Sequence, residues 1–235
     1  MKERPILFSA PMVRALLDGS KTQTRRVMKP QPVAIPGEPG KHWWPSNAAQ
    51  SMIRIEDSFQ KYPGIFDDAC PHGQPGDRLW VRESFWGCDL PGYGDQPCVV
   101  YDDEWSGKEY APSQERPWAR KFGRIPSIHM PRDCSRILLE IVSVRVERLN
   151  DCSEADAKAE GVAPNWIGPL DKGPNGLGGE GWPGDDYRHY TNGTDGDPAY
   201  SARESFESLW ESINGAGAWE VNPWCWAITF RRVTP

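Results

Sequence analysis

The apolar residues of the chain recur at two spacings, and the helical spacing of three and four residues is clearest at two places. Residues 10–18 carry it between Ser9, which can cap a helix, and Gly19, which can end one. Residues 201–213 carry it again after Ser201, which is followed three residues later by a glutamate, as in a capping box. Both stretches predict amphipathic helices with one face in the core.

A third, shorter helix is expected in the second half of the chain. The tetrapeptide Ser-Glu-Ala-Asp at 153–156 is similar to a capping box, so the helix opens at Asn150 or Ser153, and Gly161 is placed to close it. Glu160 then lies in the last turn, where the negative end of the helix dipole disfavours a carboxylate unless a cation lies nearby. From the sequence alone, chance explains that placement equally well.

Alternation of apolar and polar residues predicts about five strands. They lie at residues 5–8, 21–27, 77–86, 136–148 and 224–233. In the longest of them the apolar face changes near Ser143, which predicts a β-bulge. Because crossover helices mostly do not separate these strands, the pattern favours a small closed or half-closed barrel. We expect an α+β fold, a small β-barrel with flanking helices, in a single domain over residues 1–235.

Glycine and proline add long loops to this picture, because the 235 residues include 23 of each. They gather in stretches with little periodicity, which we interpret as loop insertions at about 28–74, 87–125 and 162–200. The last insertion carries Trp166, Trp182 and Tyr187. We expect it to flank the mouth of a pocket and to be more mobile than the barrel.

The net charge of −6 argues against a general nucleic-acid coat protein, since non-specific binding to phosphates needs a basic surface. A local basic cleft stays compatible with this charge. No apolar run approaches the roughly 18 residues of a membrane helix. The start of the sequence has no apolar core long enough for a signal peptide. We therefore expect a cytoplasmic protein with no membrane partner.

The cysteines do not form a recognisable metal or disulfide pattern. The six of them, at 70, 88, 98, 134, 152 and 225, include no CxxC pair, and disulfides are uncommon in the cytoplasm. Cys70 and His72 are two residues apart, but no second pair completes the spacing of a zinc site. We expect neither a metal nor a cofactor.

The stretch from Gly19 to Arg26 carries the most informative chemistry. A lysine, Lys21, and a threonine, Thr24, stand three residues apart and are followed by an arginine. In a strand Lys21 and Thr24 would face opposite sides, so they can meet only if Lys21 lies in the turn before the strand. A buried lysine beside Arg26 would have a lowered pKa and could act as a base. The alternative interpretation is a solvated turn, as for most runs of charge.

The pattern Gly19-x-Lys21-Thr22-x-Thr24-x-Arg26 resembles the signature of the ASCH domain family, which has a PUA-like β-barrel. Three further segments are similar to that family in the same order: 75–79, the helix over 149–161 and the strand over 224–230. The resemblance covers about half of the chain. The insertions resemble the longer phage and prophage members, in which the hexapeptide at 127–132 also recurs.

The resemblance implies an enzyme that removes the acyl group from N4-acylated cytosine nucleosides such as N4-acetylcytidine. It places Thr24 as nucleophile, Lys21 as base and Glu160 as the carboxylate that orients the lysine and returns the proton. Arg26 would help to stabilise the oxyanion. Burial and Arg26 should lower the pKa of Lys21, whereas Glu160 should raise it.

Three other functions stay open at this point. An ASCH barrel can bind RNA or a modified nucleoside without cleaving it, it can act as a metal-independent ribonuclease, or it can serve as a phage assembly factor. The expected partner is a modified pyrimidine nucleoside or RNA. Further substrate-binding candidates are an acid that is also suited to structural pairing, aromatic residues that can stack on a base, and basic residues that can hold a phosphate or carbonyl: Glu83, Trp80, Phe85, His129, Arg132 and Arg136.

Overall fold

The computed structural model describes residues 1–46, 51–57, 64, 66, 69–89, 97–101, 123–162, 187–190 and 199–234. The chain divides into two compact units, each built from separated segments. The first comprises Met1–Gly19, Phe66–Val144 and Thr229–Pro235, and the second comprises Ser20–Ile65 and Arg145–Ile228. The strands at 138–148 and 224–233 each contribute residues to both units.

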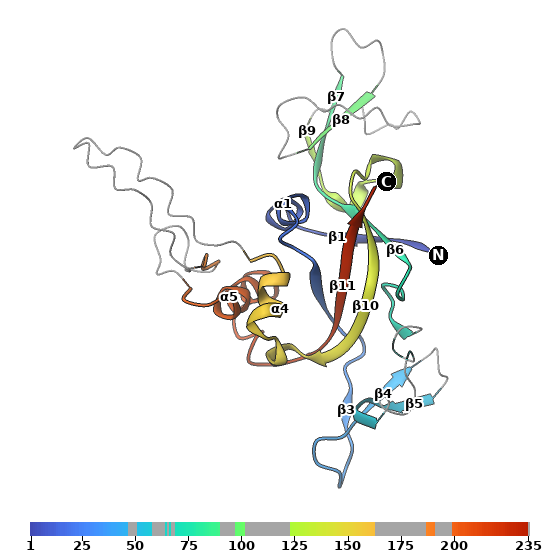
Figure 1. Cartoon of the computed structure of the whole chain (residues 1–235), viewed down its shortest axis with the longest axis vertical. Coiled ribbons are helices and arrows are strands. Elements are labelled where there is room, and N and C mark those ends of the chain that lie inside the picture. Colours follow the sequence, from blue (N-terminus) through green and yellow to red (C-terminus); the bar gives the residue numbers. More distant parts are fainter. Residues whose placement is uncertain are drawn as a thin grey trace, which may run out of the picture. The chain divides into compact units, whose positions relative to one another are not determined.

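The largest sheet has five strands in the order β1-β6-β10-β11-β2 (Figure 1). Their bounds are Glu3–Leu7 for β1, Arg78–Arg82 for β6, Leu138–Arg148 for β10, Trp224–Val233 for β11 and Gln23–Val27 for β2. Strand β1 pairs in parallel with β6, and β10 pairs antiparallel with β6. Over the described residues this sheet ends at β1 and β2, so the α+β class is confirmed and no closed barrel is formed.

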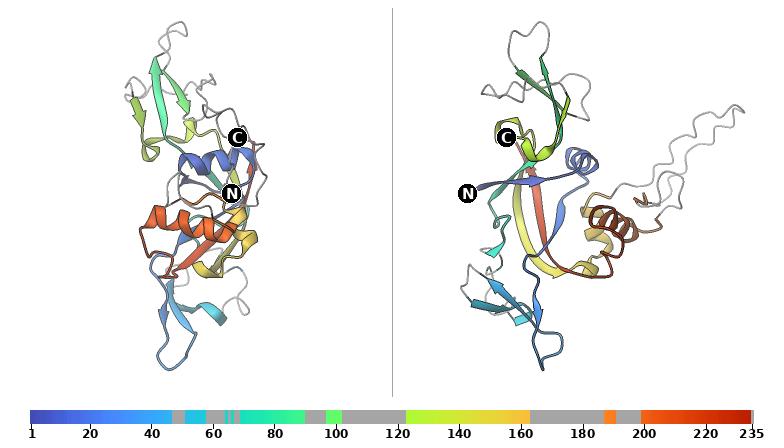
Figure 2. Two further views of the ribbon diagram at one scale, coloured as in Figure 1. Left: turned by 90° about the vertical axis from the view of Figure 1, so that its left-hand side faces the viewer. Right: turned by 180° about the vertical axis from the view of Figure 1, so that it is seen from behind.

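The first unit starts with β1 and the helix α1, Ala10–Asp18, which ends at Gly19 with φ 85° as expected. The predicted strand 77–86 is two strands, β6 and β7, the latter over Phe85–Asp89. β7 is the centre of a separate sheet of order β8-β7-β9, with β8 at Pro97–Tyr101 and β9 at Gly123–Ile125 (Figure 2). Two 3-10 helices follow, η1 at Ser127–His129 and η2 at Arg132–Cys134.

The expectation that 87–125 is irregular was therefore partly wrong. The sheet encloses its own small core, formed by Phe85, Val99, Tyr101, Ile125, Met130 and Cys134. Its strands have only three to five residues and stand among glycines and prolines, so packing in the folded chain, not local alternation, stabilises them. The backbone register aligns residue 88 of β7 with residue 98 of β8, an alignment that the spacing of Cys88 and Cys98 in the sequence did not indicate.

The second unit contains a three-stranded sheet of order β3-β4-β5 within the expected first insertion. The strands are Val33–Ala34, His42–Ser46 and Ser51–Arg54. The interpretation of 28–74 as a loop was therefore wrong for these residues. Trp44, on β4, is buried and contacts Trp226 edge to face at 5.4 Å between ring centroids, which attaches the insertion to strand β11.

Two helices complete the second unit and lie side by side, α4 at Glu154–Ala159 and α5 at Ala202–Asn214 (Figure 1). A 3-10 helix, η3 at Leu149–Asp151, joins β10 to α4. Residues 163–186 and 191–198, with Trp166 and Trp182, lie outside the described residues. Tyr187 is described, and the Lys158 ammonium lies 5.9 Å from its ring centroid.

The serines predicted to cap these helices differ in what their side chains do. Ser153 accepts a hydrogen bond from the backbone N–H of Asp156, and the Asp156 carboxylate accepts one from the Ser153 backbone, which completes the expected capping box. Ser201 caps α5 by accepting from the N–H of Glu204. Ser9 has cap geometry but forms no side-chain cap bond.

This difference yields a paired stability test. Ser153→Ala removes a capping bond and should lower the free energy of unfolding by about 1 kcal/mol. Ser9→Ala, the matched control, should change it by much less because no cap bond is lost. Urea unfolding of the two variants and the wild type measures both effects. Equal losses in the two variants would contradict this account of the caps.

Candidate functional site

The segment that precedes β2 closes the C-terminal end of α4. The Thr22 backbone N–H donates to the carbonyl of Ala159 at 2.8 Å, and Lys21 Nζ donates to the carbonyl of Glu160 at 2.6 Å. Gly161, with φ 78°, ends the helix as expected. The last carbonyls of a helix have no partner inside it, and a cation there is favoured by the dipole. Lys21 therefore lies in the turn before the strand, where the sequence argument required it.

The Glu160 carboxylate is shared by two cations. Its Oε2 lies 3.2 Å from Lys21 Nζ, and its Oε1 accepts a hydrogen bond of 3.0 Å from Arg25 Nη1. Lys21, Arg25 and Glu160 are exposed by only 4%, 2% and 3%. Moving such a carboxylate out of water costs several kcal/mol unless charged partners compensate. Deleting one partner of a buried ion pair therefore destabilises a fold by roughly 3–5 kcal/mol. The Glu160 carboxylate at the helix end thus has the cationic partner that its position called for.

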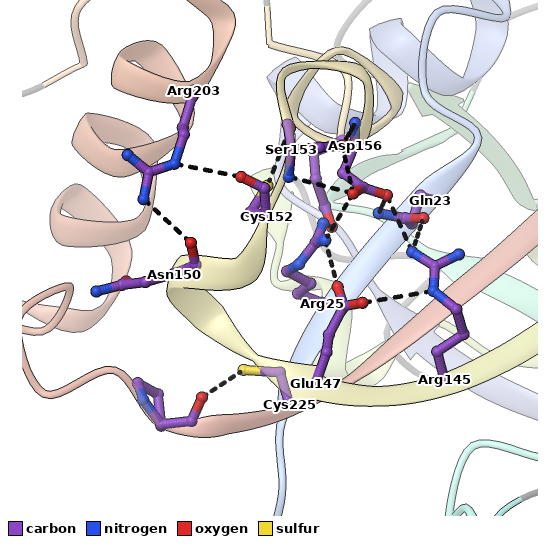
Figure 3. Close-up of polar contacts among 12 residues, drawn as sticks. Gln23, Arg25, Arg145, Glu147, Asn150, Cys152, Ser153, Asp156, Arg203 and Cys225 are labelled. Atoms are coloured by element: carbon purple, nitrogen blue, oxygen red, sulfur yellow. Dashed lines mark hydrogen bonds and ion pairs between the residues drawn. The ribbon is translucent and has the colours of Figure 1, made fainter. Parts of the chain in front are cut away.

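Arg25 connects this carboxylate to two more acids (Figure 3). Its guanidinium forms an ion pair with Glu147 of β10, and its Nη2 lies 3.6 Å from Asp156 Oδ2 of α4. Arg145 lies on the outer side of the same acids and donates to Asp156 Oδ1 at 2.9 Å and to Glu147 Oε2 at 3.4 Å. β2, β10 and α4 are thereby joined by one continuous set of charged contacts, which we call the Glu160 network.

The surroundings of Lys21 lower its pKa. Burial lowers the pKa of Lys21, the charge of Glu160 raises it, and Arg26 and Arg25 lower it, with a net result below the ordinary value. The direction and the roles of burial, Arg26 and Glu160 agree with the expectation from the sequence. Over the described residues the charged contacts of the network join three cationic and three anionic side chains: Lys21, Arg25, Arg145, Glu147, Asp156 and Glu160.

Thr24 and Arg26 lie on the other face of β2 from Arg25, because strand side chains alternate. Thr24 is 1% exposed. Arg26 is half-buried and donates to the carbonyl of Arg25 at 3.2 Å. The structure therefore brings Lys21 and Glu160 into contact, and it places Thr24 on β2, the strand that follows the turn with Lys21.

The six other candidates belong to the first unit, where two of them form a buried ion pair. Arg136 donates to Glu83 through Nε at 2.9 Å and through Nη2 at 2.8 Å. The guanidinium of Arg136 also stacks 4.1 Å from the ring centroid of Tyr101. Phe85 is fully buried in the core beside Tyr101. The structural pairing that the sequence offered for Glu83 is the one observed, and the role of Phe85 is packing.

Of the remaining three candidates, Trp80 is buried, Arg132 is partly exposed and His129 is exposed. Trp80 is 8% exposed and carries the Arg82 guanidinium 4.6 Å from its ring centroid. His129 is exposed at the end of η1. Arg132 pairs with Glu3 at 2.7 Å. Trp80 is therefore covered by an arginine and Arg132 already has a carboxylate partner, while His129 is accessible to solvent.

Sequence reasoning missed Arg25, Glu147 and Asp156. One signal for them was present: Asp156 and Glu160 are four residues apart, so both point to one face of α4 and call for a cation opposite that face. Arg26 was a candidate from the sequence, whereas its neighbour Arg25, which faces the acids, was not.

Other chemistry in the described residues is limited. Cys70, Cys134, Cys152 and Cys225 are free and buried, and burial raises the pKa of both Cys152 and Cys225 to about 12. No group of three or more histidine, cysteine or acidic side chains arranged to hold a metal ion occurs in the described part of the chain. None of the helices described there is long and apolar enough to cross a membrane.

Comparisons of the chain with protein-family models, with curated proteins and with solved structures found no match in any of the three.

The Glu160 network predicts a specific pH dependence of stability. Burial raises the pKa of Asp156, but hydrogen bonds from Ser153 and the charge of Arg25 lower it more, to about 2 from 3.8. A carboxyl with a lowered pKa in the folded state stabilises the fold above its unfolded pKa and stops doing so as the pH falls through its folded pKa. Wild type should therefore exceed Asp156→Asn in unfolding free energy at pH 5, with the gap closing from below pH 3.8 towards pH 2.

Urea unfolding at pH 7, 5 and about 3 measures this gap. The matched control is Asp151→Asn, which replaces an exposed aspartate of η3 that makes no contact with Arg25. It should lower the unfolding free energy little at any of these pH values. A gap for Asp156→Asn that stays constant down to the lowest pH would show that the carboxylate charge does not stabilise the fold.

Proposed function

We propose that this protein is an amidohydrolase of the ASCH type, with a PUA-like fold, that releases a carboxylic acid from N4-acylated cytosine nucleosides. The observation that carries the proposal is the buried contact between Lys21 and Glu160, two residues that are 139 positions apart. They are two of the three residues to which the sequence resemblance assigns catalysis. The third, Thr24, lies on the strand that follows Lys21 directly.

The state of Lys21 fits the role of a base. A neutral amine has two N–H donors and one lone pair, whereas an ammonium has three donors and no lone pair. Lys21 has two acceptors on Glu160, the carbonyl and Oε2. A neutral Lys21 would use both N–H groups there and keep its lone pair for a hydroxyl. Burial and the two neighbouring arginines, which lower its pKa, favour that form.

The reaction would proceed in two stages. Thr24 Oγ1 attacks the acyl carbon while Lys21 accepts its proton, and Arg26 with backbone N–H groups stabilises the oxyanion. The bond from the acyl carbon to N4 then breaks, and the proton held between Lys21 and Glu160 passes to the departing amine. Water attacks the acyl ester of Thr24 in the same way, which releases the carboxylic acid and restores the hydroxyl.

A second function is favoured by one observation, the bond from Lys21 Nζ to the Glu160 carbonyl at 2.6 Å. It shows Lys21 closing the end of α4, which is a structural role. With that role alone, the protein would be a nucleoside- or RNA-binding module that needs the lysine only for folding. Turnover of N4-acetylcytidine, followed through the ultraviolet absorbance of cytidine formation, separates the two, and loss of intact RNA in the presence of a chelator identifies the ribonuclease alternative.

Replacing Lys21 tests the base directly. Activity should rise with pH through the neutral range, since the lysine must lose its proton. Lys21→Arg keeps a positive charge but stays protonated, so it cannot act as a base. It should lower kcat by about a hundredfold or more, and Lys21→Ala should have a similar effect. The control is Lys158→Arg, at an exposed position of α4, and this variant should retain full activity. Near wild-type turnover by Lys21→Arg would establish that the lysine supplies only charge, and would favour the binding module.

Thr24 provides a separate test of the nucleophile. Thr24→Ser keeps a hydroxyl and should retain part of the activity, whereas Thr24→Val keeps the shape and should lose it, because only the hydroxyl can attack. Thr22→Val is the matched control, since Thr22 is exposed and contacts α4 only through its backbone. Initial rates with N4-acetylcytidine and unfolding curves are compared for all three. Full activity in Thr24→Val would refute a threonine nucleophile.

A further inference from the structure

Arg25 makes contacts that no sequence argument assigned to it. It is 2% exposed, its Nη1 binds Glu160 Oε1 at 3.0 Å, and the opposite oxygen of that carboxylate binds Lys21 at 3.2 Å. A carboxylate held at both oxygens by different cations has one orientation. If Arg25 were absent, Glu160 could turn both oxygens to Lys21, and the geometry of the pair would no longer be defined.

Arg25 is also held in place by contacts other than the one with Glu160. Its guanidinium pairs with Glu147 and lies 3.6 Å from Asp156 Oδ2 (Figure 3). The ring centroid of Phe206 on α5 lies 5.8 Å from the central carbon of that guanidinium. Asp156 in turn is held by the capping box of α4. The planar guanidinium can address three carboxylates at once, which the single-point ammonium of a lysine cannot do.

We propose that Arg25 is a positioning residue of the site: it clamps the Glu160 carboxylate by one oxygen, so that only the other oxygen faces Lys21. It touches neither the substrate nor Thr24, which lies on the other face of β2. The inference rests on the proposed function for its effect on catalysis, but its effect on Lys21 does not depend on that function.

The charges that surround Lys21 set the expected direction. Burial disfavours the charged form of Lys21, Glu160 favours that form, and Arg26 and Arg25 disfavour it. The charged and titratable groups come from β2, from β10, from the turn before α4 and from α4: Arg25, Arg26, Arg145, Glu147, Cys152, Asp156 and Glu160. Removing Arg25 takes away a repelling cation and leaves Glu160 to Lys21 alone. Both changes favour a protonated lysine.

The experiment compares Arg25→Met with Arg145→Met. Arg145 binds Glu147 and Asp156 as Arg25 does, but it does not bind Glu160, so it is the matched control. The first readout is the titration of Lys21 by NMR of labelled lysine side chains, which needs no substrate. In Arg25→Met the Lys21 midpoint should move up by about 1 pH unit or more, and in Arg145→Met it should stay in place.

The second readout is the pH profile of N4-acetylcytidine hydrolysis. In Arg25→Met, kcat at pH 7 should fall by about tenfold, the equivalent of one pH unit, and recover at higher pH with KM little changed. A merely structural role would lower the rate by one factor at every pH and leave the Lys21 titration unmoved, which overturns the proposal. An equal shift in Arg145→Met also overturns it, because contact with Glu160 would then not matter.

Two further results are separable. If the wild type hydrolyses no acylated cytidine but the Lys21 midpoint moves in Arg25→Met, the proposed function fails and the role of Arg25 in setting Lys21 stands. If Arg25→Met does not fold, Arg25→Lys replaces it, keeping a charge but not the three-way contact. Its Lys21 midpoint should lie between those of the wild type and of a lysine exposed to water. A wild-type midpoint together with a wild-type pH profile in Arg25→Lys refutes the clamp.

Discussion

Burial of the Glu160 carboxylate is the constraint on which this part of the fold depends. A charge in that position is tolerated only when cations reach both of its oxygens, and the two that do so come from a turn and a strand near residue 20. The requirement holds β2 against the end of α4, and it holds Arg25 where Glu147 and Asp156 can neutralise it in turn. The same contacts give α4 a partner for its last carbonyls.

Stability and chemistry therefore use the same atoms. A buried ion pair adds little net stability compared with apolar residues of the same size, because desolvation offsets the attraction. Charged groups at this place fix the orientation of Glu160 and lower the pKa of Lys21, which apolar packing cannot do. This is the physical reason for treating the Glu160 network as a functional site as well as part of the fold.

The helices and long strands followed from the sequence because local signals define them. Ser153 with Asp156, Gly19 and the alternation over 224–233 each led to the element observed. The short strands β3, β4, β5, β8 and β9 did not, since glycine and proline surround them and packing of residues such as Trp44 and Tyr101 stabilises them.

The candidate site divides in the same way. The meeting of Lys21 with Glu160 could be anticipated, because a carboxylate at a helix end calls for a cation. Arg25 could not be told from Arg26 without knowing which face of β2 the acids occupy. The open edge of the five-stranded sheet also depends on pairings between distant segments, which no local pattern encodes.

The order of strands in the sheet bears on how the protein is made. β2 lies next to β11, and α4 begins more than a hundred residues after Lys21. A ribosome therefore completes β2 long before either neighbour exists, and the early segment waits with an unpaired edge and a cationic turn. Contacts of such long range make folding slow and expose intermediates to aggregation. During synthesis the edge of β2 is therefore open to non-native pairing until β11 emerges.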